Sequence, residues 1–213
     1  MVALLLTLSL ISTPTDLPQT DFTLHVDVIR HVSVTQSDLD LARETAASLL
    51  RAAHVALDWR DCDASMALCS DVAHDVASIH VRLVHAISAG HDDDCGAVIQ
   101  DPRSHIPGVL VYVPAVDDKV LRFRLRSTGR SDPRISTLRR GHLIGLVVAH
   151  ELGHALGLRH AQSGVMKANL DEDDILALRQ SRLTFLAGER ARILDAFVAA
   201  AREHQSPLQG RGQ

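Results

Sequence analysis

Three histidines and a glutamate in the C-terminal half of this 213-residue chain have the types and spacing of a catalytic metal site. Residues 150–160 read His-Glu-Leu-Gly-His-Ala-Leu-Gly-Leu-Arg-His. On a helix, His150 and His154 project from one face with Cβ atoms about 5–6 Å apart, close enough to share one ion. Gly157 favours the left-handed backbone conformation that ends a helix, so the chain can bring His160 back as a third ligand.

Glu151 supplies the group that such a site needs for acid–base chemistry. It points to the side of the histidine face, so it can reach a metal-bound water without being a ligand itself. Three protein ligands leave the fourth position of a zinc ion for water, as catalytic zinc requires. The pattern therefore predicts a zinc hydrolase that uses Glu151 as its general base.

The residues around the motif predict a buried helix, because apolar side chains occupy nearly all of its faces. Three histidines that converge in such a helix with a carboxylate are more easily explained by a metal than by separate hydrogen bonds. The apolar positions are Leu143, Ile144, Leu146, Val147, Val148, Ala149, Leu152, Ala155, Leu156 and Leu158.

Together with a methionine after the third histidine, this pattern resembles the metzincin family of zinc metallopeptidases, whose signature is H-E-x-x-H-x-x-G-x-x-H followed by a Met-turn. Met166 follows His160 by six residues, with Gly164 just before it. The resemblance implies that Met166 forms an apolar floor beneath the imidazoles. It is nearest to matrixins and small bacterial metzincins. The chain departs from the family in having Ala161 after the third histidine and no tyrosine after Met166.

The resemblance implies a fold and a reaction. The fold is α+β and metzincin-like, with a twisted mixed sheet and two long helices in an upper subdomain and a small, mostly helical lower subdomain across the zinc cleft. The reaction is endopeptidase hydrolysis, in which a zinc-bound water loses its proton to Glu151 and attacks a peptide carbonyl. The alternative is a catalytically silent, zinc-stabilised module that binds peptides or proteins. Glu151 argues against it, since a structural zinc site needs no acid–base group.

The remaining elements follow from the periodicity of apolar residues. Phe22 to Arg30 alternates as a half-buried strand, with Phe22, Leu24, Val26 and Val28 on one face. Ser37 is predicted to cap a helix that runs to about residue 53. Further short strands are predicted at Val55 to Trp59, Ile79 to Val84, Ala97 to Gln100 and Val109 to Val113.

Two segments have two interpretations each. By the resemblance, Cys95 to Gln100 is the antiparallel edge strand that pairs with extended substrate, but the same short apolar run suits an ordinary core strand. The acidic run 171–174 is interpreted as the cap of a helix beginning near Ile175 rather than as a calcium site, because acids at a helix N-terminus are favoured by the macrodipole. A last helix is predicted at about Ala187 to Glu203.

Composition places the chain among globular proteins with one domain. Its 46% hydrophobic residues suffice for a core, and a net charge of −4 argues against nucleic acid as the main partner. The expected partner is a peptide or protein substrate, and the sequence gives no oligomeric state. Basic residues crowd positions 119–140; we interpret them as solvated surface, with a patch for anionic substrate as the alternative.

The ends of the chain and its cysteines bear on localisation. The apolar run within residues 1–15 is too short to span a membrane and suits a signal peptide, although a buried strand is the alternative. The catalytic domain is expected at 20–204, divided near residue 157 into the two subdomains, with a flexible tail at 205–213. Export would make the protein secreted or periplasmic, and Cys62 and Cys69 could then form a disulfide that leaves Cys95 free. Without export the protein would be cytoplasmic, with three reduced thiols.

Overall fold

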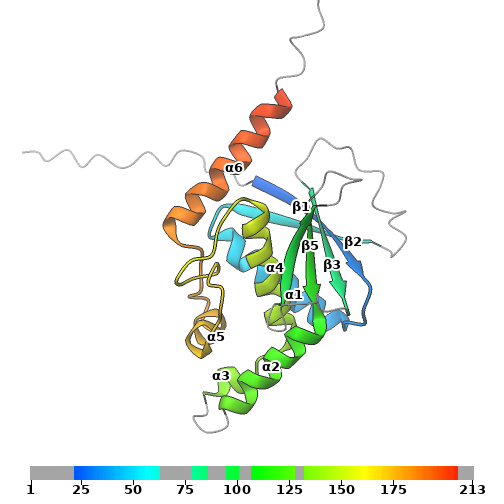
Figure 1. Cartoon of the computed structure of the whole chain (residues 1–213), viewed down its shortest axis with the longest axis vertical. Helices are drawn as coiled ribbons and strands as arrows, with labels where there is room; N and C mark the ends of the chain where they lie inside the picture. The colour runs from blue at the N-terminus through cyan, green and yellow to red at the C-terminus, as the bar shows by residue number, and fades with distance from the viewer. Residues whose placement is uncertain (1–21, 63–77, 86–94, 101–106, 128–131, 206–213) are drawn as a thin grey trace, which may run out of the picture.

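The computed structural model describes residues 22–62, 78–85, 95–100, 107–127 and 132–205 (Figure 1). The predicted signal peptide at 1–15, Cys69 and nearly all of the predicted tail lie outside these residues. Among the described residues, no helix is both long and apolar enough to cross a membrane.

A five-stranded mixed sheet forms one layer of the molecule. Its strand order is β2-β1-β3-β5-β4, and every neighbouring pair is parallel except β4 and β5. Among the described strands, the short β4 is therefore an antiparallel edge and not a central strand, while its pairing with substrate stays a prediction. The strands are β1 (Phe22–Arg30), β2 (Val55–Cys62), β3 (Ser78–Val84), β4 (Gly96–Gln100) and β5 (Pro107–Tyr112).

Strand β1 has the predicted apolar face, but it is not half-buried. Leu24, Val26 and Val28 belong to the main core, while Asp27 and Ile29 on the opposite face are also buried. The reason is that β1 lies between β2 and β3, inside the sheet. The carboxylate of Asp27, only 2% exposed, forms an ion pair at 2.9 Å with Arg60 of β2, its register partner.

Two long helices pack on one face of the sheet and against each other (Figure 1). They are α1 (Gln36–Arg51) and α4 (Arg140–Ala155). Gly141 and Gly145, one turn apart on α4, allow close approach, because a Cβ at either position would collide with a backbone carbonyl of α1. This contact fixes α4, which carries the histidine motif, against the sheet.

The N-terminus of α1 differs from the prediction. Thr35, not Ser37, is the N-cap, and its hydroxyl accepts a hydrogen bond of 3.1 Å from the backbone N–H of Asp38. Ser37 lies in the first turn, where its hydroxyl accepts from Arg139 at 2.7 Å. Both residues are good caps, so residue type alone could not separate them.

The basic stretch contains a helix that the prediction lacked. Val113 begins α2 (Val113–Ser127) rather than ending a strand, and the short α3 (Pro133–Ser136) follows. Several of its cations are not simply solvated. Arg140 binds Asp117 through two hydrogen bonds of 2.5 and 2.7 Å, and Arg124 donates to the carbonyl of Leu138 at 2.8 Å. These contacts tie α2 to α4 and to the loop before it.

Two further helices follow the motif, α5 (Glu172–Arg179) and α6 (Ala187–Gln205). Asp171 is the N-cap of α5, with its carboxylate accepting from the N–H groups of Asp173 and Asp174 at 3.0 and 3.1 Å. Asp171 is thus a cap as interpreted, but the helix begins at Glu172 rather than near Ile175, so the other three acids lie in its first turn. Phe197 of α6 stacks on Phe22 of β1, with ring centroids 5.3 Å apart, so the last helix is joined to the sheet.

Candidate metal centre

The C-terminal end of α4 brings the three motif histidines together. His150 and His154 lie on its last turns, and the helix ends where Gly157 takes a φ of +85°. The N–H of Leu158 then bonds to the carbonyl of Gly153 at 2.9 Å, which is the Schellman arrangement of a glycine-ended helix. The turn returns His160 to its partners, as predicted, and one ring nitrogen from each histidine lies within 4.8 Å of the others.

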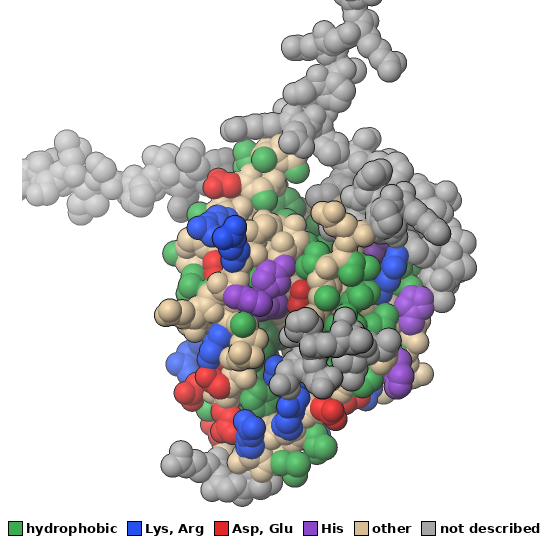
Figure 2. All heavy atoms as spheres, in the orientation of Figure 1, with side chains coloured by type: hydrophobic (Ala, Val, Ile, Leu, Met, Phe, Trp, Pro, Cys, Tyr) green, Lys and Arg blue, Asp and Glu red, His purple; other side chains and the backbone are tan. Residues whose placement is uncertain are grey.

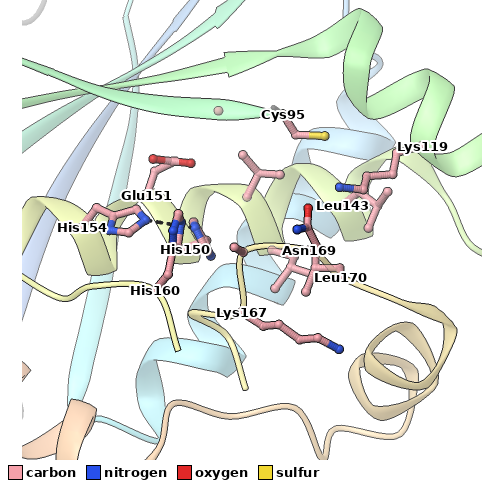
Figure 3. A pocket seen from close by; sticks show the side chains of 14 residues that line it. Cys95, Lys119, Leu143, His150, Glu151, His154, His160, Lys167, Asn169 and Leu170 are labelled. Carbon is pink, nitrogen blue, oxygen red and sulfur yellow. Dashed lines mark hydrogen bonds between the residues drawn. The ribbon is translucent and has the colours of Figure 1, made fainter. Parts of the chain in front are cut away.

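The imidazole rings are oriented by backbone carbonyls. The Nδ1 atoms of His150 and His154 contact the carbonyl oxygens of Val165 and Leu158 at 2.8 and 2.9 Å. A carbonyl can only accept, so each Nδ1 carries the proton and each Nε2 presents a lone pair. These two Nε2 atoms face each other at 3.1 Å (Figure 3). Two lone pairs at that distance repel unless a proton or a metal ion lies between them.

The geometry of these nitrogens fits zinc. Tetrahedral coordination at about 2.0–2.1 Å from each nitrogen puts two ligand nitrogens about 3.3 Å apart, close to the 3.1 Å between His150 and His154. Carbonyl bonds to the far ring nitrogen are the usual way in which proteins hold histidine ligands. Burial lowers the pKa of His150 to about 4, which keeps its imidazole neutral and able to bind metal.

Met166 packs against the motif helix at Gly153, and its predicted place beneath the imidazoles stays a prediction. It is fully buried, and its thioether fills the space that a Cβ on Gly153 would need. Gly164 has a φ of +80°, and the N–H of Ala161 bonds to the carbonyl of Met166 at 2.9 Å, which closes the loop. The same turn carries the Val165 carbonyl that orients His150. The turn therefore both supports the helix from below and fixes one ligand.

Glu151 lies beside the histidines and faces strand β4. Its side chain is 7% exposed, and its Cγ and Oε1 lie 2.8 and 2.9 Å from where a Cβ on Gly96 would stand. In Figure 3 the carboxylate is next to the imidazole cluster and points away from the helix axis. This is the position expected of a proton carrier that is not a ligand.

A cavity of about 360 Å³ is lined by the three histidines and Glu151, together with residues from neighbouring segments. Figure 2 shows histidine side chains gathered at the centre of the visible face, where the cavity opens. Gly96 lies in the segment 95–100 that one interpretation gave as a substrate-binding edge, but several other lining residues were not predicted for the site, among them Lys119, Lys167, Asn169 and Leu170. Only the basic stretch, with its alternative of an anion patch, gave a signal for one of them, Lys119. The others depend on which segments the fold brings to α4.

The cysteines are divided between two states. Cys62 is disulfide-bonded, whereas Cys95, at the wall of the cavity, is not part of a disulfide. Cys69, the predicted partner of Cys62, lies outside the described residues. The pairing of Cys62 with Cys69 therefore stays a prediction.

Comparison with known proteins gives a fold likeness and no family. No family model matches the chain, and no curated protein matches it. Among solved structures, it is similar to the crystal structure of archaemetzincin from Methanopyrus kandleri, with 14% sequence identity. The match covers 85% of this chain and 98% of that one, with a TM-score of 0.48. Likeness at this level does not establish membership of a family, so function is argued from the site itself.

Proposed function

We propose that this protein is a zinc-dependent endopeptidase of the metzincin type, related to the matrixins or to the small bacterial members. The observation that supports the proposal best is the pair of facing Nε2 atoms on His150 and His154, each with its Nδ1 held by a carbonyl. A metal ion held by both nitrogens would account for that arrangement. His160 supplies the third nitrogen and Glu151 the adjacent base.

The site residues have two roles, which are to hold the metal and to transfer protons. His150, His154 and His160 would hold zinc, which when bound supplies Lewis acidity for polarising a peptide carbonyl and acidifying water. Glu151 accepts a proton from the attacking water and returns it to the leaving amine. Its burial against Gly96 restricts its carboxylate to the side of the cavity next to the imidazoles.

The position of strand β4 supports a role in aligning the substrate. It is the antiparallel edge of the sheet, and its first residue, Gly96, lines the cavity beside Glu151. An edge strand offers backbone N–H and C=O groups that can bind an extended peptide as an additional strand. We propose that a substrate lies along β4, with its scissile carbonyl between Glu151 and the histidines.

A catalytically silent zinc-binding module is the competing function, and one experiment separates the two. Zinc content is measured by elemental analysis, and cleavage is measured with a peptide library, for the wild type and for Glu151→Gln. The peptidase proposal expects about one zinc per chain in both proteins and a loss of cleavage of at least about a hundredfold in the variant. Zinc binding without cleavage by the wild type would support the silent module instead.

Export is part of the same proposal, since the apolar run within residues 1–15 has the length of a signal-peptide core. Mass spectrometry of the native protein, with and without reductant, tests it. Export predicts a mature chain that begins after Ser12 and contains the Cys62–Cys69 disulfide. A protein that retains Met1 and has three alkylatable thiols would contradict both.

A further inference from the structure

The cavity extends well beyond the histidines. It runs along α4 toward the N-terminal half of that helix, where Leu143 and Val147 line it. Leu143 precedes His150 by seven residues, which is about 10 Å along a helix axis. Leu170, after the Met-turn, lines it as well. The distance from the histidines to this end is therefore one that an extended side chain of several bonds can span.

Lys119 of α2 lies at that far end. It is partly buried, and Figure 3 shows its side chain at the end of the cavity away from the histidines, next to Asn169. Within the part of the chain that the structure describes, no carboxylate forms an ion pair with it. Asp117, two residues earlier, is bound by Arg140 instead.

The second lysine of the cavity has a different environment. Lys167 contacts Asp171 at 2.5 Å and Asp174 at 2.7 Å, so its charge is neutralised within the protein. The charge of Lys119 is not matched in this way, and it contributes to the low pKa of His150. The far end of the cavity therefore has a positive charge that a ligand could neutralise.

From this arrangement we propose that Lys119 determines specificity by binding a carboxylate of the substrate at the far end of the cavity; the inference rests on the proposed peptidase function. A substrate carboxylate there would form a charge-assisted hydrogen bond with the ammonium of Lys119. The part of the substrate that leads to this carboxylate would pack on Leu143 and Val147. Two parts of a peptide carry such a group: an acidic side chain next to the scissile bond, and a free C-terminus.

The test uses the full chain and four peptides that share one cleavable sequence. The first pair has Glu in one peptide and Gln in the other at the residue after the scissile bond. The second pair ends one or two residues beyond the scissile bond, with a free C-terminus in one peptide and an amidated C-terminus in the other. In at least one pair, we expect the peptide with the carboxylate to have a kcat/KM at least about tenfold higher than its amide counterpart. A tenfold difference corresponds to about 1.4 kcal/mol. The pair that shows the difference identifies the source of the carboxylate.

Three variants assign the preference to Lys119. Lys119→Met keeps the length of the stem and removes the charge, and should abolish the preference. Lys119→Arg should retain most of it, which shows that charge rather than folding is responsible. Arg126→Met removes an exposed cation from the same helix and should retain the preference fully. A preference that persists in Lys119→Met, or that is absent from the wild type, overturns the inference.

A binding measurement separates this inference from the proposed function. Fluorescence anisotropy compares the Kd of the carboxylate and amide peptides for the Glu151→Gln variant and for the double variant that also carries Lys119→Met. Binding that depends on Lys119 without cleavage by the wild type would support the carboxylate site and contradict the peptidase. Cleavage without any carboxylate preference would contradict the site and leave the peptidase.

Discussion

Glu151 and Gly96 are in direct contact across the space between α4 and the edge strand. The Cγ and Oε1 atoms of Glu151 lie 2.8 and 2.9 Å from the position that a Cβ on residue 96 would take, and Val147 Cγ1 lies at 2.7 Å. Side chains do not approach a real Cβ this closely. The proposed base can therefore occupy its place only because residue 96 has no side chain.

This contact gives the first prediction, for Gly96→Ala. The added methyl must displace the Glu151 carboxylate or Val147 by several tenths of an ångström, and misplacement of about 1 Å can cost about a hundredfold in rate. We expect peptide hydrolysis to fall at least about tenfold while zinc content stays at the wild-type level, measured by kcat/KM and elemental analysis on the same samples.

The matched control is Gly188→Ala. Residue 188 lies near the start of α6, and a Cβ there meets nothing within 4 Å. Its hydrolysis should equal that of the wild type. Wild-type activity in Gly96→Ala would mean that Glu151 does not need its present position, and would count against its role as the base.

The three-histidine assignment gives the second prediction. His160→Ala removes one of three protein ligands, so zinc retention after dialysis should fall well below one per chain. Arg159→Ala, which changes the exposed neighbour, should leave retention unchanged. Equal zinc occupancy in the His160 variant and the wild type would show that the third ligand is another residue.

The histidine motif could be predicted from sequence because its geometry is local. His150, His154 and Gly157 lie on one helix and its end, so 3.6 residues per turn and one left-handed glycine determine their arrangement. The Met-turn is also close in sequence. The rest of the cavity wall was not predictable, because Lys119 and Gly96 reach α4 through strand order and helix packing. A short apolar run does not identify its neighbours, and for this reason β4 could be assigned to the sheet edge only from the structure.

The missed helix α2 has a different cause. Val116, Val120 and Phe123 are buried at the i, i+4, i+7 spacing of a helix face. The many charged residues between them obscure this spacing in the sequence. The contacts of Arg124 and Arg140 were not predicted for the same reason. An arginine that joins two segments cannot be distinguished from a solvated arginine until the positions of both segments are known.

Met166 gives a prediction about packing. It is fully buried against Gly153 and Phe185, and we assign it no bond to the metal. Met166→Leu conserves the volume and should lower the free energy of unfolding by less than about 1.5 kcal/mol. Met166→Ala leaves a cavity and should lower it by about 2–5 kcal/mol. Chemical denaturation measures both values, and loss of zinc in Met166→Leu would indicate that the sulfur is a ligand.

The last prediction concerns stability at acidic pH and His142, a buried residue of α4 that does not line the cavity. Burial, and then the nearby guanidinium of Arg179, lower the pKa of His142 to about 4 from an ordinary 6.5. Its Nδ1 accepts a hydrogen bond of 3.0 Å from the backbone N–H of Arg139. In the unfolded chain the imidazole would take up a proton near pH 6.5, whereas in the folded protein it stays neutral down to about pH 4.

The sign follows from this difference. The unfolded state binds more protons below pH 6.5, so the contribution of His142 to stability is complete above pH 6.5 and is lost as the pH falls toward 4. The His142→Asn variant retains an acceptor near Arg139 but cannot be protonated. Between about pH 7.5 and 4.5, the free energy of unfolding should therefore decrease less in the variant than in the wild type, by about 1–3 kcal/mol. Urea denaturation of metal-free samples at about pH 7.5, 6.0 and 4.5 measures the difference. His150 contributes equally to both proteins, so its titration cancels in the comparison.

The control is His31→Asn, which removes a histidine at an exposed position. Parallel curves for His142→Asn and the wild type would show that His142 is not responsible for acid sensitivity.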